Sequence, residues 1–302
     1  MEVEGRIVEL NKDNLKDFTD FCRKHRDQVD DSHLYEEDLN SFEYSPENPT
    51  FLYMEGKQVV AAASLIIDEY NRRGNRARFR ILYSEKNNRA VYDSIFHRIL
   101  IHAIDLEKVY IFVPSSNIEL MGRIEDLGFK AERFVYLMVR DDAPVPEDEI
   151  PEGYEISSVE LEEDYAGWCK VRNEAFAFVT GNEIPVCTEM IMTYSDKEDY
   201  LPGGMMLLRH NGEPVGTVRC IKDEYEGKPV VNIGSLSVLP DYQHKGLGSM
   251  LLREAIRFAH GAGYERTILS VNENNKGARS IYDRGGFTEV EGVVSYEYHI
   301  NR

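Results

Sequence analysis

The chain has 302 residues, of which 42% are hydrophobic and 11% aromatic, and its formal net charge is −19. This length predicts about two domains, and the hydrophobic content excludes a disordered chain. The negative charge argues against general affinity for nucleic acid or for anionic membranes, because both bind basic surfaces.

The chain shows no targeting, membrane or metal-binding signal. No apolar run reaches the roughly 20 residues of a membrane span, and the N-terminus lacks the basic start and apolar run of a signal peptide. The four cysteines are scattered without metal-ligand spacing: Cys22, Cys169, Cys187 and Cys220. We therefore expect a cytoplasmic protein with structural thiols and no metal.

The segment 141–153 indicates a domain boundary, because it combines three prolines with a run of acidic residues. We predict a first domain over 1–140, an extended linker over 141–153 and a second domain over 154–302.

Hydrophobic periodicity and turn residues predict the same order of elements in both halves. In the first half these are a helix over 12–24, paired strands at 51–54 and 58–67, a strand over 78–83, a helix over 89–106, a strand over 109–113 and a helix over 117–127. In the second half they are a strand at 154–157, helices over 160–178 and 188–194, a hairpin of 204–209 and 213–218, a strand over 230–238, a helix ending near 260, a strand over 266–271, a helix over 275–284 and a final strand pair from 287 onward.

Two landmarks set the register of this repeat. Asn117 and Asn275 lie 158 residues apart, as do Leu127-Gly128-Phe129 and Gly285-Gly286-Phe287, while the preceding helices align better near 156. A period this long indicates duplicated domains rather than a solenoid. The order of elements predicts a mixed α/β (α+β) sheet in each copy, with a pocket at the Gly-rich turn.

That turn, Gln243-x-x-Gly246-x-Gly248, follows a strand ended by Pro240 and opens a helix. Glycines let the backbone curl, and the first N–H groups of a helix have no internal partners and point at an anion. The pattern therefore predicts a phosphate-binding turn.

After one more strand comes Asn275-x-x-Ala278-x-x-x-Tyr282, followed by Gly286-Phe287. Together with the Gly-rich turn, this segment resembles the acetyl-CoA signature of the GNAT superfamily, Q/R-x-x-G-x-G/A and then N-x-x-A-x-x-x-Y. The resemblance covers the second half with specific motifs and the first half by order of elements alone. The tandem arrangement is somewhat similar to that of mycothiol synthase.

The resemblance implies two tandem GNAT folds and assigns roles in binding acetyl-CoA. Tyr282 would protonate the departing thiolate; as an alternative it is a core aromatic residue. The residues implied to bind acetyl-CoA are Leu236, Ser237 and Val238 at the strand end, Gln243, His244, Lys245, Gly246, Leu247, Gly248 and Ser249 around the pyrophosphate, and Asn275 on the pantetheine arm. His244 is equally well explained as a solvated loop residue.

The sequence departs from the family pattern at the general base. Many members carry a Glu six positions before the strand-ending valine, and here that position is Asn232, which cannot accept a proton. The base is then a carboxylate such as Glu174 or Glu183, or a water chain, or it is unnecessary. Deprotonation at pH 7 costs about 4.6 kcal/mol for a lysine-like amine and about 1.4 kcal/mol for an α-amine, which favours a weakly basic acceptor.

The first half lacks the signature. At the 158 offset Glu85, Asn88 and Ala90 stand where the second half has Gln243, Gly246 and Gly248, and the tyrosine position holds Ile124. At 156 both glycines are missing as well. We therefore expect a degenerate copy that has lost cofactor binding.

The leading hypothesis is an acetyl-CoA-dependent N-acetyltransferase that acts on an amine of a small molecule or peptide by direct attack, as a monomer or homodimer. A non-catalytic CoA-binding sensor or interaction module is the alternative. A third hypothesis, a peptidyl transferase fed by aminoacyl-tRNA, is disfavoured by the charge of −19.

Overall fold

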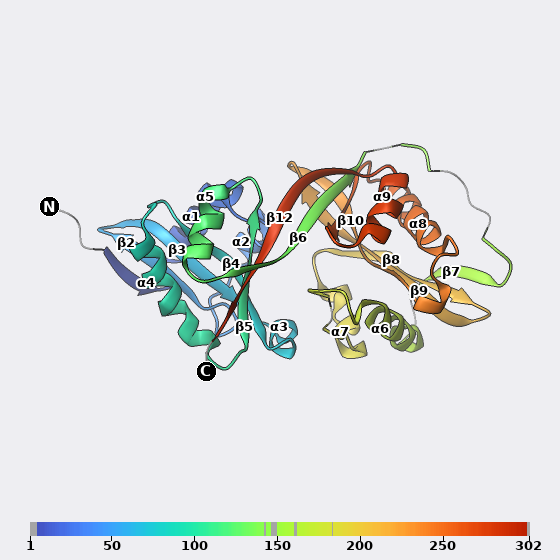
Figure 1. Cartoon of the computed structure of the whole chain (residues 1–302), viewed down its shortest axis with the longest axis horizontal. Helices are drawn as coiled ribbons and strands as arrows, with labels where there is room; N and C mark the ends of the chain where they lie inside the picture. Colours follow the sequence, from blue (N-terminus) through green and yellow to red (C-terminus); the bar gives the residue numbers. More distant parts are fainter. Residues whose placement is uncertain (1–4, 142, 146–149, 160–161, 183, 301–302) are drawn as a thin grey trace. The chain divides into compact units, whose positions relative to one another are not determined.

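The computed structural model describes residues 5–141, 143–145, 150–159, 162–182 and 184–300, and the chain forms two compact units (Figure 1). Unit 1 comprises Met1–Val135 and Glu291–Arg302, and unit 2 comprises Tyr136–Val290. No helix among the described residues is long and apolar enough to cross a membrane.

Unit 1 contains a mixed sheet in the order β1-β2-β3-β4-β5-β12. Its strands are antiparallel except for β4 and β5, which run parallel. The elements are β1 (Gly5–Glu9), α1 (Leu15–His25), α2 (Glu36–Asn40), β2 (Thr50–Glu55), β3 (Gln58–Ile66), α3 (Glu69–Arg73), β4 (Arg76–Ser84), α4 (Arg89–Leu100), β5 (Lys108–Pro114), α5 (Ile118–Asp126), the first part of β6 (Lys130–Arg140) and the second part of β12 (Thr288–His299).

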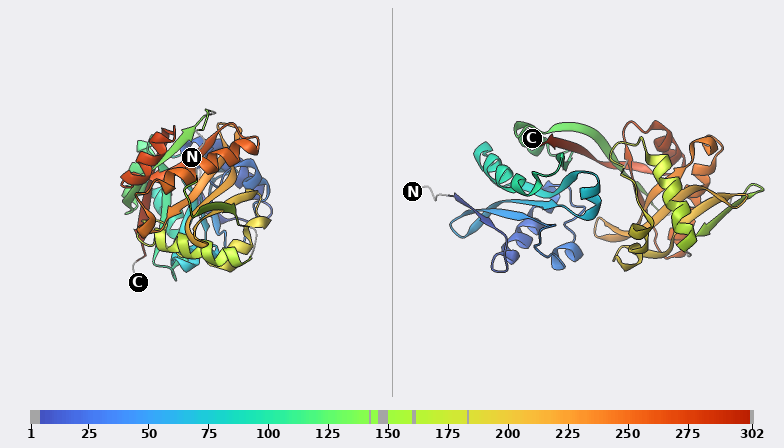
Figure 2. Two further views of the ribbon diagram at one scale, coloured as in Figure 1. Left: turned by 90° about the vertical axis from the view of Figure 1, so that its right-hand side faces the viewer. Right: turned by 90° about the horizontal axis from the view of Figure 1, so that it is seen from below.

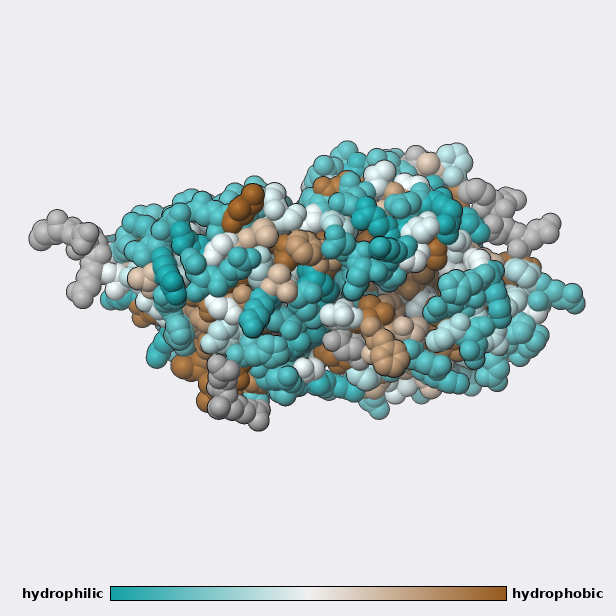
Figure 3. Space-filling model, in the orientation of Figure 1, coloured by the Kyte–Doolittle hydropathy of each residue, from teal (hydrophilic) through white to brown (hydrophobic). Residues whose placement is uncertain are grey.

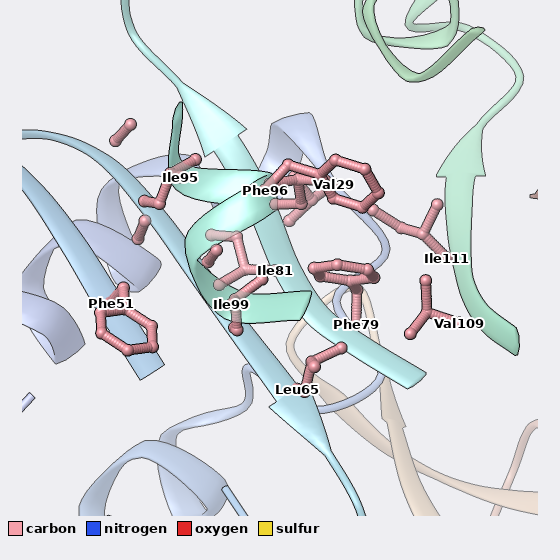
Figure 4. Packing of buried hydrophobic residues seen from close by; sticks show 14 of the residues in the cluster. Val29, Phe51, Leu65, Phe79, Ile81, Ile95, Phe96, Ile99, Val109 and Ile111 are labelled. Atoms are coloured by element: carbon pink, nitrogen blue, oxygen red, sulfur yellow. The ribbon is translucent and has the colours of Figure 1, made fainter. Parts of the chain in front are cut away.

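Aromatic and branched residues form the part of the unit 1 core where α4 packs on the sheet. Phe79 of β4 packs on Phe96 of α4, with ring centroids 6.2 Å apart, and both rings contact Phe129. Figure 4 shows this packing, with Ile95 and Ile99 of α4 beside the sheet. Burial of each such side chain contributes about 1.5–3 kcal/mol, so α4 is held on the sheet by its apolar face.

Unit 2 repeats the arrangement with the order β6-β11-β10-β9-β8-β7. Here β10 and β11 are the parallel pair, and the pairs β10–β9, β9–β8 and β8–β7 are antiparallel. Besides the second part of β6 and the start of β12, the elements are β7 (Tyr154–Ser158), α6 (Glu162–Phe176), α7 (Thr188–Met192), β8 (Tyr200–His210), β9 (Glu213–Tyr225), β10 (Lys228–Val238), α8 (Leu247–Gly261), β11 (Thr267–Asn272) and α9 (Lys276–Arg284).

Helices cover both faces of the unit 2 sheet (Figures 1 and 2). Val218 of β9 and Ile233 of β10 belong to the same buried cluster as Leu251 of α8. On the other face, Leu207 of β8 packs with Trp168 of α6. Because strand side chains alternate between faces, residues next to Val218 and Ile233 point toward the α6 side.

In both units the central parallel strands pair only at one end. β4 pairs β5 from Arg76 to Arg78, and β10 pairs β11 only at Val231 and Asn232. Beyond these residues the two strands separate, which leaves the C-terminal end of β4 and of β10 without a parallel neighbour.

The predicted mixed α/β sheet in each half is confirmed, with differences at the ends of elements. The helix expected over 89–106 ends at Leu100 and continues as a 3-10 turn, and residues 160 and 161 of the helix expected from 160 lie outside the described residues. The prediction of a final strand pair from 287 onward is wrong. β12 is one strand, because Gly292 stays extended and accepts a hydrogen bond from the Ser115 N–H. The units also divide the chain differently from the sequence ranges, because β6 ends in unit 2 and β12 ends in unit 1.

Candidate active site in unit 2

The end of β10 contains a β-bulge fixed by two hydroxyl groups. Its register with β9 shifts between Gly234 and Ser237, and Ser235 adopts a φ of 48°. The fully buried Thr217 hydroxyl donates to the Ser235 carbonyl at 2.8 Å and lies 2.7 Å from the Ser237 hydroxyl. Since Thr217 has one hydroxyl proton, Ser237 is the donor in the second bond. Ser237 therefore fixes the bulge and is not placed as a base.

The bulge directs a backbone donor toward the gap beside β11. The Leu239 N–H donates to the Val215 carbonyl on the β9 side at 2.9 Å. Since successive N–H groups of a strand point to opposite edges, the Val238 N–H faces the edge from which β11 has separated. Leu236, Ser237 and Val238, the three residues expected at the strand end, form the end of β10 that borders this gap.

The loop from β10 to α8 is held by its own polar side chains. The Gln243 amide donates to the Val238 carbonyl at 3.0 Å. Lys245 donates to the Asp241 carbonyl at 3.0 Å, and its ammonium group lies 4.8 Å from the centre of the Tyr242 ring. His244 is exposed with a φ of 61°. The side chains of Gln243 and Lys245 thus hold the loop by hydrogen bonds to backbone carbonyls, so the groups that remain to bind a ligand at the turn are those of the backbone.

The N-terminus of α8 is uncapped. Gly246 is the N-cap residue, with a φ of 82° and no side chain to cap the helix, and a Cβ there would have nothing within 4 Å. A Cβ on Gly248 would lie 3.3 Å from Ile281 of α9, so this glycine allows the two helices to approach. The first N–H groups of the helix, from Leu247 to Ser249, have no hydrogen-bond acceptor among the described residues, which is the arrangement of an anion site.

Two polar residues of α9 complete the set. Asn275 caps the helix through its side-chain oxygen, which accepts the Ala278 N–H at 3.1 Å, and its NH₂ group has no hydrogen bond to the described residues. Tyr282 is 8% exposed and packs on Phe287, and its hydroxyl makes no hydrogen bond within the described part of the chain. Burial raises the pKa of Tyr282 to about 12, so the phenol is protonated at neutral pH.

The corresponding donors of unit 1 are satisfied by the chain itself. The Ser84 N–H at the end of β4 donates to the Tyr92 hydroxyl at 3.1 Å, and the side chain of Asn88 caps α4 by accepting the Ala90 N–H at 2.9 Å. The NH₂ group of Asn117, the counterpart of Asn275, donates to the Gln28 carbonyl at 2.8 Å.

The loop of unit 1 is also shorter. Residues 85–88 connect β4 to α4, whereas residues 239–246 connect β10 to α8. The helices α4 and α8 begin at Arg89 and Leu247, which are 158 residues apart and support the 158 register. Glu85, which this register aligns with Gln243, pairs with Lys24 and His25.

The position expected to carry a general base contacts a carboxylate from the neighbouring strand. Asn232 donates to the Asp223 carboxylate of β9 at 2.8 Å. Burial raises the pKa of Asp223 above its usual value. Sequence reasoning missed Asp223, although the Glu226-Gly227 turn between the two strands is the signal that could have placed it opposite Val230, two residues from Asn232.

The sequence suggested two other carboxylates as the base. Glu174 is exposed in the last turn of α6, and Glu183 lies outside the described residues. The buried face of α6 instead fixes the next loop: Asn173 exchanges two hydrogen bonds of 2.8 Å with the backbone of Val186, and Arg172 donates to the Ile184 carbonyl.

The described residues contain no cluster of His, Cys, Asp and Glu that could hold a metal ion. None of the four cysteines forms a disulfide, and burial raises the pKa of Cys22 and of Cys220 to about 12 and that of Cys169 to about 11. These three thiols are therefore protonated at neutral pH and are poor nucleophiles.

Comparison with known proteins finds a family match over the part of the chain that contains this site. The model of the Acetyltransferase (GNAT) family matches residues 173–287. The chain is 34% identical over 102 residues to an uncharacterised N-acetyltransferase of Methanocaldococcus jannaschii, which covers 33% of this chain and 45% of that protein. It is 29% identical over 160 residues to the mycothiol acetyltransferase of Streptomyces coelicolor, which covers 50% of this chain and 48% of that protein. The chain thus spans about half the length of these curated relatives.

Solved structures share the fold over nearly the whole chain. A GCN5-related N-acetyltransferase from Sphaerobacter thermophilus matches with a TM-score of 0.74 at 19% identity and covers 99% of this chain and 96% of that one. A tandem GNAT protein from the clavulanic acid biosynthesis pathway matches with a TM-score of 0.72 at 14% identity and covers 99% of each. The family model matches within the second half, and family membership implies an acyl-CoA co-substrate. Residues 173–287 therefore match the GNAT family, and the chain as a whole shares the fold of tandem GNAT proteins.

Proposed function

We propose that the protein is an acetyl-CoA-dependent N-acetyltransferase whose cofactor site lies in unit 2 alone. One observation supports this most strongly. In unit 1 the chain itself uses the corresponding donors. Tyr92 accepts from the N–H at the strand end, Asn88 caps the helix N-terminus, and the Gln28 carbonyl accepts from Asn117, the counterpart of Asn275. In unit 2 the helix carries no cap and the Asn275 NH₂ group has no described partner.

The residues of unit 2 fit acetyl-CoA by the chemistry of their donors. The pyrophosphate would be held by the backbone of residues 243–249, where helix N–H groups and the helix dipole favour an anion by about 0.3–1 kcal/mol each. The gap beside β10 would receive the pantetheine arm, with the Asn275 NH₂ group as a further donor. When bound, acetyl-CoA supplies an activated acetyl thioester.

Groups of the chain would then stabilise the acetyl oxygen and protonate the departing sulfur. The Val238 N–H points into the gap, where it would stabilise negative charge that develops on the acetyl oxygen. The buried Tyr282 hydroxyl, protonated at neutral pH, would donate a proton to the departing sulfur. Because the site is dry around Tyr282, the thiolate would also be less stable as an anion there, which favours the transfer.

For the acceptor we propose a primary amine of a small molecule or peptide. Curated relatives are named mycothiol acetyltransferases, and a small-molecule amine acceptor is in keeping with that name. We propose that the catalytic half begins at Tyr154, after a linker over 141–153. β6 still contributes to it, since the Arg140 guanidinium donates to the Gly285 carbonyl at 3.0 Å.

A screen of thiol release from acetyl-CoA against a broad panel of amines tests this function. We expect CoA to be released with at least one class of primary amine, and an acetylated product to be found by mass spectrometry. If the protein binds acetyl-CoA but releases no thiol with any amine, it is a CoA-binding sensor instead.

A further inference from the structure

The carboxylate of Asp223 on β9 lies beside Asn232, the residue of β10 at which β10 and β11 separate. Asn232 belongs to the last residue pair between these strands, and its NH₂ group donates to one oxygen of Asp223 at 2.8 Å. The other oxygen of Asp223 accepts the backbone N–H of Glu224 at 2.8 Å. No ion pair of Asp223 with any described residue is present, although the side chain is partly buried.

This carboxylate lies on the face of the sheet opposite α8. Val231 and Ile233 pack into the cluster under α8, so Asn232 between them points to the α6 side. Asp223 contacts Asn232 and therefore lies on that side as well.

The neighbouring charged groups on this face are incompletely satisfied. Arg219 of β9 lies 3.7 Å from Asp199, too far for a hydrogen bond, and one buried atom of each side chain has no partner. The guanidinium group stacks 4.0 Å from the centre of the Tyr194 ring, and Lys197 lies 5.4 Å from the same ring. The face therefore offers polar atoms that an acceptor could bind.

We propose that Asp223 is the general base that takes a proton from the acceptor amine, and that Asn232 is a positioning residue that holds its carboxylate. The inference rests on the proposed acetyltransferase function and adds to it an acceptor that arrives as a protonated amine. It replaces the expectation that the site favours a weakly basic amine, because that expectation assumed no carboxylate beside the strand.

The proton balance of the reaction is complete with these groups. The ammonium gives one proton to Asp223, and the freed nitrogen lone pair forms the new C–N bond to the acetyl carbon. The C–S bond breaks, Tyr282 protonates the sulfur, and the second nitrogen proton restores the phenol. Asp223 is partly exposed, so it returns its proton to solvent.

The surroundings of Asp223 raise its pKa above that of an ordinary aspartate. Burial is the largest influence on Asp223 and raises its pKa, the hydrogen bonds from Asn232 and from the Glu224 N–H lower it, and the charge of Asp199 raises it. A base acts in its deprotonated form, so the rate rises as pH increases through this pKa. The raised pKa places that rise above the pH at which an ordinary aspartate titrates.

The test compares pH–rate profiles for two primary amines of different basicity. Asp223→Asn should lower kcat by about 10²–10⁴-fold and remove the acid limb, while acetyl-CoA affinity stays unchanged. Asp199→Asn should move the acid limb to lower pH, since it removes the like charge. Asn232→Ala should move the limb to higher pH, since it removes a hydrogen bond that lowers the pKa. Glu224→Gln, one residue along the strand on the opposite face, is the matched control and should leave the profile unchanged.

The double variant Asp223→Asn with Asn232→Asp exchanges carboxylate and amide across the same hydrogen bond and should recover part of the lost rate. If Asp223→Asn keeps the wild-type kcat and the wild-type acid limb, Asp223 is not the base, and the proposed acetyltransferase function is unaffected. A wild-type protein that binds acetyl-CoA and acetylates no amine would overturn the proposed function and this inference together.

Discussion

The backbone N–H of Ser84 donates a hydrogen bond to the hydroxyl of Tyr92, across 3.1 Å, at the end of β4 that no longer pairs with β5. The Glu85 N–H, next along the chain, bonds the Val60 carbonyl, just as the Leu239 N–H bonds the Val215 carbonyl in unit 2. Ser84 therefore corresponds to Val238, and Tyr92 occupies the donor that we assign to the cofactor in the second copy. Unit 1 keeps the separated strands of the fold, but its corresponding donors form hydrogen bonds within the chain.

Gly246→Glu should abolish acetyl-CoA binding without unfolding the protein. The carboxylate would fill the turn and repel the pyrophosphate. Gly212→Glu is a matched control, because Gly212 has a φ of 87° against 82° at Gly246 and a Cβ at either has nothing within 4 Å. Both variants carry the same backbone strain, so a similar Tm with binding lost only in Gly246→Glu supports the site. Unchanged CoA affinity of Gly246→Glu would show that the phosphate site is elsewhere.

Tyr282→Phe should lower kcat by about 10²–10⁴-fold and leave acetyl-CoA affinity nearly unchanged. The hydroxyl has no described partner, so its loss should cost little stability. Since the pKa of Tyr282 is about 12 and the phenol acts in its protonated form, the wild-type rate should show no alkaline fall from this group below about pH 11.

Tyr296→Phe is the matched control for Tyr282→Phe. Tyr296 is a buried tyrosine of unit 1 whose hydroxyl donates to Glu125 at 2.9 Å. Its loss should cost about 0.5–1.5 kcal/mol of stability and leave kcat unchanged. Equal kcat in Tyr282→Phe and wild type would remove Tyr282 from the chemistry.

Thr217→Val should weaken acetyl-CoA binding although Thr217 lies on β9. The substitution removes the hydroxyl that donates to Ser235 and accepts from Ser237, and it leaves buried polar atoms unpaired at a cost of about 1–3 kcal/mol. The bulge should then relax and move the Val238 N–H. Thr217→Ser keeps the hydroxyl and should recover most of the affinity in calorimetry; equal affinity in all three proteins would separate the bulge from binding.

The sequence predicted those parts of the site that depend on local chemistry. Gly246 marks a helix start with a positive φ, Gly248 marks the close approach of α9, and Asn275 is a helix N-cap, so each leaves a signal within a few residues. The helices with long apolar faces, α4 and α8, were likewise predicted from periodicity, apart from the exact end of α4.

What the sequence did not predict depends on contacts between distant residues. The short helices α2 and α3, the strands β1 and β6, and the single course of β12 through Gly292 are set by their neighbours rather than by their own pattern. Tyr92 reads as an apolar residue of α4, and only the fold shows that its hydroxyl reaches Ser84. Asp223 reads as one of many surface acids on a chain whose visible face is largely hydrophilic (Figure 3).

The central claim is that one copy of the fold binds acetyl-CoA and the other does not. Isothermal titration calorimetry of the full chain with acetyl-CoA measures this directly. The account predicts one site per chain in the wild-type protein and none in Gly246→Glu. Two sites per chain, or one site that persists in Gly246→Glu, would contradict it.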